Sequence, residues 1–109
     1  MNLKQKTAFF QMILKYPNIL NNEFITVNGN SMYPSLVDGQ KVRINTSNIS
    51  IKKGDIIVYR YFYDHLTIHR VIKIILNNGN KYYVTKGDNN PMIDDYIIND
   101  NHIIGTIIG

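Results

Sequence analysis

The sequence has no cysteine and no tryptophan, and only 3 of its 109 residues are proline. Without cysteine, the chain can form neither a disulfide framework nor a thiolate metal site. Acidic residues are also scarce, since 8 of them stand against 12 basic residues and give a formal net charge of +4. This excess is spread along the chain, whereas nucleic-acid binders usually carry a dense basic face, so we expect no nucleic-acid partner.

Long hydrophobic runs are missing as well, because no stretch reaches the roughly 18 apolar residues of a transmembrane helix. The best candidate, residues 7–14, ends at Lys15 and is followed by no small-residue cleavage site, so it does not fit a removable signal peptide. The histidines His65, His69 and His102 are dispersed, which argues against zinc, and we expect no metal or cofactor. We therefore expect a soluble, cytoplasmic protein or one peripheral to a membrane.

Apolar residues recur at helical spacing near the N-terminus and predict one amphipathic helix over residues 1–20. The residues of this stripe are Phe9, Phe10, Ile13 and Leu14. Two roles fit it. Either the stripe packs on the rest of the domain, or the helix, with lysines along its rim, docks on a membrane surface or a partner protein.

Beyond the helix, short runs rich in β-branched and aromatic residues alternate with turn signals and predict six strands. They cover residues 24–27, 41–45, 55–63, 67–76, 81–86 and 102–108. A chain of 109 residues can bury one modest core. The sequence therefore predicts a single compact, mainly β domain over residues 1–109, with a β core over residues 24–109.

One predicted hairpin can be taken further, because Asn78-Gly79 is a strong signal for a tight primed turn. If these two residues form its tip, His69 in the first strand lies opposite Asp88 beyond the second. A carboxylate beside a histidine fixes its tautomer and stabilises the imidazolium that forms when it accepts a proton. Strand alternation turns Arg70 to the other face, where we expect a structural ion pair.

Residues 29–40 resemble the nucleophile box of the type I signal peptidases and self-cleaving repressors, whose pattern is Gly-x-Ser-Met-x-Pro. Four later segments are similar to the other boxes of this superfamily and follow in its order. They are residues 53–59, 68–72, 85–90 and 102–105. The resemblance runs from about residue 27 to residue 109, and it implies the β-rich catalytic fold of these peptidases and serine endopeptidase activity.

The base separates the branches of this superfamily. Most bacterial signal peptidases and the repressors use lysine, whereas the endoplasmic-reticulum, archaeal and spore-former type uses histidine, which this chain has as His69. The resemblance implies Ser31 as nucleophile, His69 as general base and an aspartate as orienter. Family spacing favours Asp94, the hairpin register favours Asp88, and Asp95 is adjacent. We expect Asp94 to be the third member and Asp88 to support it.

Residues next to the serine have supporting roles in this scheme. Met32 is expected to pack beside the site, and Gly29 supplies no hydroxyl of the kind that some relatives place there. The N–H of Ser31 would help to hold the oxyanion. Since residues 1–26 contain no membrane anchor, we expect a peptidase that trims a leader or signal-type segment from a peptide or protein precursor. The alternative is a catalytically idle module that holds or delivers such a precursor.

Overall fold

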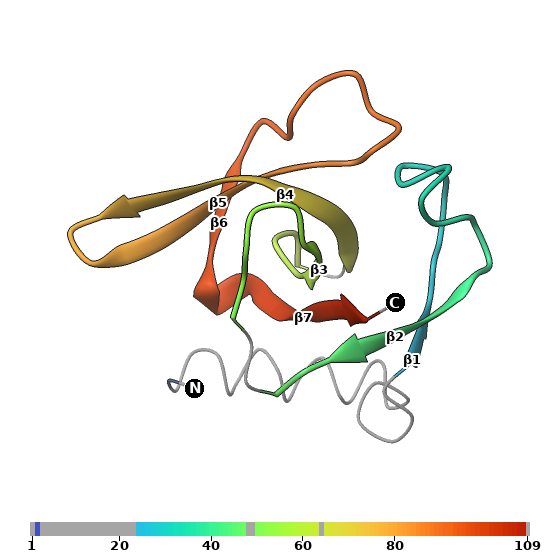
Figure 1. Ribbon diagram of the computed structural model, residues 1–109, viewed down its shortest axis with the longest axis horizontal. Helices are drawn as coiled ribbons and strands as arrows, with labels where there is room; N and C mark the ends of the chain where they lie inside the picture. Colours follow the sequence, from blue (N-terminus) through green and yellow to red (C-terminus); the bar gives the residue numbers. More distant parts are fainter. Residues whose placement is uncertain (1, 3–23, 48–49, 64, 109) are drawn as a thin grey trace.

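The computed structural model describes residue 2 and residues 24–47, 50–63 and 65–108. These residues form one antiparallel sheet of seven strands in the order β1-β2-β7-β3-β4-β5-β6. The strands are β1 (Phe24–Thr26), β2 (Lys41–Asn45), β3 (Ile56–Tyr59), β4 (Thr67–Asn77), β5 (Asn80–Lys86), β6 (Ile97–Asn99) and β7 (Ile103–Ile108). The sheet curls, so that β1 and β2 lie well apart from the long β4–β5 hairpin (Figure 1). The predicted mainly β fold is confirmed.

The described residues contain no α-helix, and their one helical element is the short 3-10 turn η1 (Asp100–His102). The amphipathic helix predicted over residues 1–20 lies outside the described residues, so its packing stays a prediction, as does the single-domain organisation. Within the described part of the chain, no helix is long and apolar enough to cross a membrane.

The strand boundaries differ from the sequence pattern mainly around β3 and β6. β3 ends at Tyr59 instead of continuing to residue 63, because the chain turns there and Arg60 Nε donates to the carbonyl of Tyr63 at 2.6 Å. β6 has no counterpart among the predicted strands, since three residues are too few to show alternation. It extends the sheet beyond β5 and pairs Ile97 with Val84.

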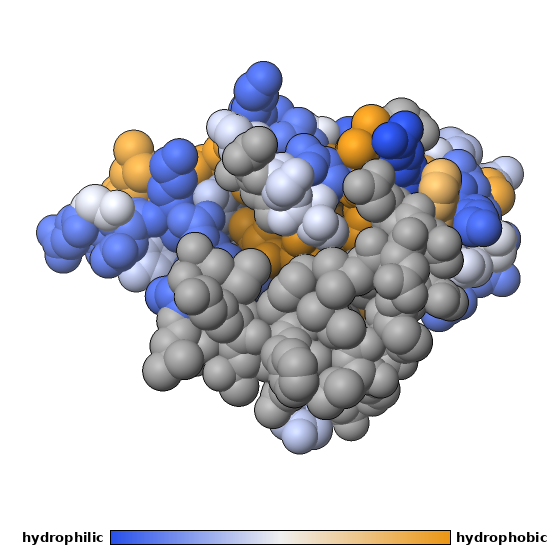
Figure 2. Space-filling model, turned by 90° about the horizontal axis from the view of Figure 1, so that it is seen from below, coloured by the Kyte–Doolittle hydropathy of each residue, from blue (hydrophilic) through white to orange (hydrophobic). Residues whose placement is uncertain are grey.

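The tip of the β4–β5 hairpin has the predicted geometry. Asn78 and Gly79 have φ angles of 52° and 79°, the left-handed conformation that asparagine and glycine tolerate best. From the tip as far as Lys73 opposite Val84, the strands pair in the predicted register. Figure 2 shows the outer end of this hairpin as a largely hydrophilic surface, so the apolar packing lies closer to the middle of the sheet.

A bulge changes the pairing further along the hairpin. The register shifts between Val71 and Lys73, so that Val71 pairs with Thr85 and β4 carries one extra residue. A one-residue shift reverses which face each later side chain meets. The prediction that Asp88 lies opposite His69 is therefore wrong, because a turn signal fixes the register only where no bulge intervenes.

A buried apolar cluster holds the loop of residues 27–40, called here the Ser31 loop. Met32 is 1% exposed and packs with Val27, Leu36 and Val42. Burying an apolar side chain of this size contributes roughly 1.5 to 3 kcal/mol. The loop is therefore anchored on both sides of Ser31, and Met32 has the packing role expected of it.

Candidate active site

Ser31 lies on a tight turn between β1 and β2 and is partly exposed. Before it, Gly29 has a φ of 87°, which glycine adopts without strain, and its N–H donates to Asp38 Oδ1 at 2.6 Å. After it, the N–H of Leu36 donates to the carbonyl of Met32 at 3.0 Å. Since Met32 and Leu36 are buried, the turn presents the serine hydroxyl from an anchored backbone.

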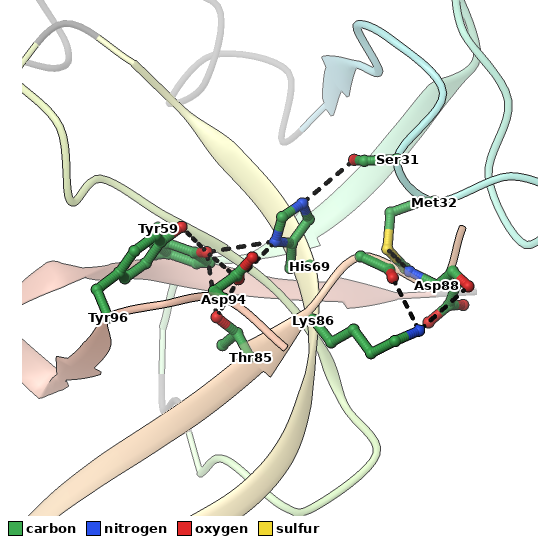
Figure 3. A network of polar contacts seen from close by, with 10 residues as sticks. Ser31, Met32, Tyr59, His69, Thr85, Lys86, Asp88, Asp94 and Tyr96 are labelled. Atoms are coloured by element: carbon green, nitrogen blue, oxygen red, sulfur yellow. Dashed lines mark hydrogen bonds and ion pairs between the residues drawn. The ribbon is translucent and has the colours of Figure 1, made fainter. Parts of the chain in front are cut away.

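His69, on β4, reaches this hydroxyl. Its Nε2 lies 3.2 Å from Ser31 Oγ (Figure 3), and the residue is only 8% exposed. Alternation along β4 puts Thr67, His69 and Val71 on the buried face. Pairing with β3, where Ile57 lies opposite His69, fixes the backbone that carries the imidazole.

Asp94 contacts the other nitrogen of the imidazole, with 2.7 Å between its Oδ2 and His69 Nδ1. A carboxylate only accepts hydrogen bonds, so Nδ1 carries the proton and Nε2 is left to accept the hydrogen of the Ser31 hydroxyl. Two contacts with Thr85 place the carboxylate. The N–H of Asp94 donates to the Thr85 carbonyl at 2.8 Å, and Thr85 Oγ1 donates to Asp94 Oδ2 at 2.6 Å.

Two tyrosine hydroxyls complete the surroundings of this carboxylate. Tyr59, the last residue of β3, donates to Asp94 Oδ2 at 3.1 Å, and the hydroxyls of Tyr59 and Tyr96 lie 2.7 Å apart. Burial raises the pKa of both tyrosines, so both hydroxyls keep their protons. Tyr59 and Thr85 lie in two of the segments that resemble the superfamily boxes, but neither that resemblance nor any pattern at Tyr96 predicts contact with the carboxylate, because their meeting depends on how separate strands pair.

Asp88 belongs to a different polar cluster. Nε and Nη2 of Arg70 donate to its two carboxylate oxygens at 2.8 and 2.7 Å, and the Ser35 hydroxyl donates to Oδ2 at 2.7 Å. The hydrogen bonds from Arg70 lower the pKa of Asp88 below its ordinary value, although burial opposes this. Asp88 therefore pairs with Arg70 and not with His69. Asp95 is exposed.

The segment that carries Asp88 also contacts the Ser31 loop directly. The N–H of Asn89 donates to the Ser31 carbonyl at 2.8 Å, and the N–H of Asp88 lies 3.3 Å from the sulfur of Met32. A Cβ on Gly87 would lie 2.7 Å from the Ser31 carbonyl oxygen, closer than real Cβ atoms approach backbone. Glycine at this position therefore lets the two loops meet.

The remaining histidines have other surroundings. His65 is exposed, and His102 Nδ1 accepts the N–H of Asn99 at 3.0 Å in the capping box of η1. Among the described residues, no three His, Cys, Asp or Glu side chains are grouped so that they could hold a metal ion. The groups at the site that could take part in a reaction are thus the hydroxyl of Ser31, the imidazole of His69 and the carboxylate of Asp94.

These three groups in series can activate an oxygen nucleophile. The imidazole can take the serine proton, and the carboxylate can hold the tautomer and stabilise the imidazolium.

Residues 12–108 match the profile of the Peptidase S24-like family. The chain belongs to this family. Membership confirms the predicted superfamily of serine peptidases and suggests that activity, but it does not separate the histidine branch from the lysine branch. No curated protein matches the chain.

Proposed function

We propose that the protein is a serine endopeptidase in which Ser31 is the nucleophile, His69 the general base and Asp94 the residue that orients the base. The observation that supports this most is the continuous chain of contacts, with 3.2 Å from Ser31 Oγ to Nε2 and 2.7 Å from Nδ1 to Asp94 Oδ2. Both distances are within or at the edge of hydrogen-bond reach, as nucleophilic catalysis requires.

The proposed reaction follows from these contacts. Ser31 Oγ attacks the scissile carbonyl while Nε2 of His69 takes its proton, and the resulting oxyanion is held by backbone donors that include the N–H of Ser31. The imidazolium then gives its proton to the leaving amine, and the acyl group stays on Ser31 as an ester. Water, activated by the neutral imidazole, hydrolyses this ester and restores the serine.

The supporting residues act through position. Met32 anchors the Ser31 loop in the core, and Gly29 allows the turn that precedes the serine. Asp88 binds Arg70 and Ser35, so it ties the Ser31 loop to β4. Such fixing matters because a displacement of about 1 Å can cost a factor of 10² in rate.

The substrate is proposed to be an extended segment of a peptide precursor, such as a leader or signal-type segment. Such segments bind well as added strands, because their main-chain groups pair with a sheet edge. Two features favour this. In the described residues β1 pairs with β2 alone, and the pairing of β4 with β5 ends at Arg70, next to His69. A strand edge therefore lies next to the base, and β1, which leads into the Ser31 loop, offers a second one within the described residues.

In this proposal we assign the chain to the histidine branch, which resembles the endoplasmic-reticulum and archaeal signal peptidases, and the histidine at position 69 supports this assignment. Residues 68–72 resemble the box that holds the base in that branch, and His69 contacts both Ser31 and Asp94, which supports a Ser-His-Asp triad. A lysine at this position would need a desolvated pocket to act as a base at neutral pH.

A peptide library made by digesting a whole proteome tests the proposal without knowledge of the substrate. New peptide ends are identified by mass spectrometry after incubation with the wild type, Ser31→Ala and Ser47→Ala. Ser47 is an exposed serine whose hydroxyl lies near Asn45, so its variant is the matched control. We expect new ends with the wild type and Ser47→Ala and none with Ser31→Ala.

Two other results would contradict the proposal. Cleavage by Ser31→Ala at the wild-type rate would remove Ser31 as nucleophile. Binding of library peptides by the wild type, with no cleavage under any condition that preserves the fold, would favour the idle peptide-binding module.

A further inference from the structure

Tyr59 has an unusual position for a residue that the proposed reaction does not use. It is 0% exposed, and its hydroxyl reaches the site from β3. Four polar atoms surround that hydroxyl: Tyr96 OH at 2.7 Å, Asp94 Oδ2 at 3.1 Å, Thr85 Oγ1 at 3.2 Å and His69 Nδ1 at 3.5 Å. A buried hydroxyl that donates to a carboxylate competes with the other donors to that carboxylate, and so it can change how strongly each of them is held.

The hydroxyl hydrogens of this cluster can be arranged so that Asp94 Oδ2 accepts two of them. A hydroxyl carries a single hydrogen. Because a carboxylate is the strongest acceptor in the cluster, we take Thr85 and Tyr59 each to donate to Asp94 Oδ2, and the hydrogen between the two tyrosines then comes from Tyr96. The result is a directed chain from Tyr96 to Tyr59 to Asp94, while His69 donates to the same oxygen from the other side.

Aromatic packing holds the outer end of this chain. The Tyr61 ring stacks on Tyr96 with 4.3 Å between centroids and 11° between planes, and Phe62 meets Tyr96 edge-on at 5.3 Å. Edge-to-face and stacked aromatic pairs contribute about 0.5 to 1.5 kcal/mol beyond burial. The segment after β3 therefore fixes Tyr96, and Tyr96 fixes the hydroxyl of Tyr59.

We propose that Tyr59 is a positioning residue for the reaction, which restrains Asp94 and limits how strongly that carboxylate attracts the imidazolium of His69, with Tyr96 as its outer partner. This inference rests on the proposed function of Ser31, His69 and Asp94. Neither tyrosine touches the reacting atoms. Tyr59 acts mainly through the carboxylate, since its contact with Asp94 Oδ2 at 3.1 Å is shorter than its contact with His69 Nδ1 at 3.5 Å.

The expected effect has a definite sign. A donor to Asp94 stabilises the carboxylate more when His69 is neutral than when the imidazolium already compensates its charge. Removing the Tyr59 hydroxyl therefore favours the protonated imidazole, and it leaves Asp94 Oδ2 with one competing donor fewer. The titratable groups that contact this pair or its partners are Tyr59 on β3 and Tyr96 in the segment before β6, and Asp95 and Tyr61 interact electrostatically with Tyr96.

Tyr59→Phe is the main variant, because it removes the hydroxyl and keeps the ring. Tyr83→Phe is its matched control, since Tyr83 is also buried and its hydroxyl donates to a carboxylate, Asp100 Oδ1 at 2.6 Å, outside this cluster. On a peptide that the wild type cleaves, the acid limb of the pH profile should move upward by roughly half a pH unit in Tyr59→Phe. KM should stay unchanged.

A second measurement does not depend on activity. In the Ser31→Ala background, proton NMR detects the Nδ1–H of His69, which is downfield because it donates to Asp94. We expect Tyr59→Phe to move this resonance further downfield, Tyr96→Phe to move it in the same direction by less, and Tyr83→Phe to leave it in place. Tyr96→Phe, at a more exposed ring, serves as the reporter if Tyr59→Phe does not fold.

The outcomes separate this inference from the proposed function. Unmoved resonances in both Tyr59→Phe and Tyr96→Phe, or an equal movement in Tyr83→Phe, would overturn the positioning role. If the wild type cleaves no peptide, the proposed function fails, while the resonance still decides whether the two tyrosines control the contact between His69 and Asp94.

Discussion

The two aspartates that flank the site, Asp88 and Asp94, lie six residues apart in one loop and serve opposite faces of β4. Asp88 contacts Arg70, and Asp94 contacts His69, the neighbouring residue on the strand. Figure 3 shows the two carboxylates in separate clusters, with Asp94 among the tyrosines and Asp88 beside Met32 and Lys86. Strand alternation alone sends the two carboxylates to different partners.

The partners differ in charge, and this difference teaches what each carboxylate can do. Asp88 has a permanent cation, held by two hydrogen bonds, and together they join the Ser31 loop to β4. Asp94 is held by neutral hydroxyls and by an imidazole. A permanent cation beside Asp94 would already neutralise its negative charge. The carboxylate would then stabilise the imidazolium that forms on His69 less strongly. The cluster around Asp88 therefore suits a structural role, and the cluster around Asp94 suits proton transfer.

The largest expected effect comes from the imidazole. His69→Ala should lower kcat by about 10⁶-fold with little change in fold, because it removes the group that takes the serine proton. For the wild type, kcat/KM should fall toward acid pH, since a protonated imidazole cannot accept a proton, and this limb should be absent from any residual activity of His69→Ala. Steady-state rates across pH check both points. Arg70→Lys, at the neighbouring residue, is the control and should keep the limb.

A smaller effect is expected where the two loops meet. Gly87→Ala should lower kcat by roughly 10²-fold, because its Cβ must push the Ser31 carbonyl away from 2.7 Å. Gly79→Ala controls for the loss of a glycine, since a Cβ there meets nothing within 4 Å, although its φ of 79° costs stability. Equal rates in the two variants, each corrected for its folded fraction, would contradict the claim that loop contact positions Ser31.

The smallest effect should come from the structural carboxylate. Asp88→Asn is expected to lower the free energy of unfolding by about 1 to 2 kcal/mol, because its hydrogen bonds from Arg70 lose their charge and are partly screened by solvent. Since folding lowers the pKa of Asp88, this stability is present above the ordinary aspartate pKa and is lost as pH falls through the folded value. Urea denaturation at several pH values should therefore show the wild type and variant converging in acid.

Much of the fold follows from local sequence signals. Asn78-Gly79 predicts the hairpin tip. The Gly-x-Ser-Met-x-Pro pattern predicts the position of Ser31 and the packing of Met32 beside it. The register of the hairpin cannot be predicted in full, because the bulge between Val71 and Lys73 depends on tertiary packing and leaves no mark in the turn.

The candidate site divides in the same way. The spacing of the boxes singles out Ser31, His69 and Asp94, which the structure brings together. Thr85, Tyr59 and Tyr96 could not be predicted as its surroundings, because they come from three segments that meet only after the sheet has formed. Side chains that contact a carboxylate from other strands have no fixed separation from it along the sequence, so no sequence pattern reveals them.

The most direct test compares the two aspartates on one peptide. The account predicts that Asp94→Asn lowers kcat by about 10⁴-fold while stability changes little, as when the aspartate of a triad becomes asparagine. Asp88→Asn and the exposed Asp95→Asn should keep kcat within about tenfold of the wild type. The three variants are compared by kcat, with each rate divided by the concentration of folded protein. A larger loss in Asp88→Asn than in Asp94→Asn would show that the roles assigned to the two carboxylates are reversed.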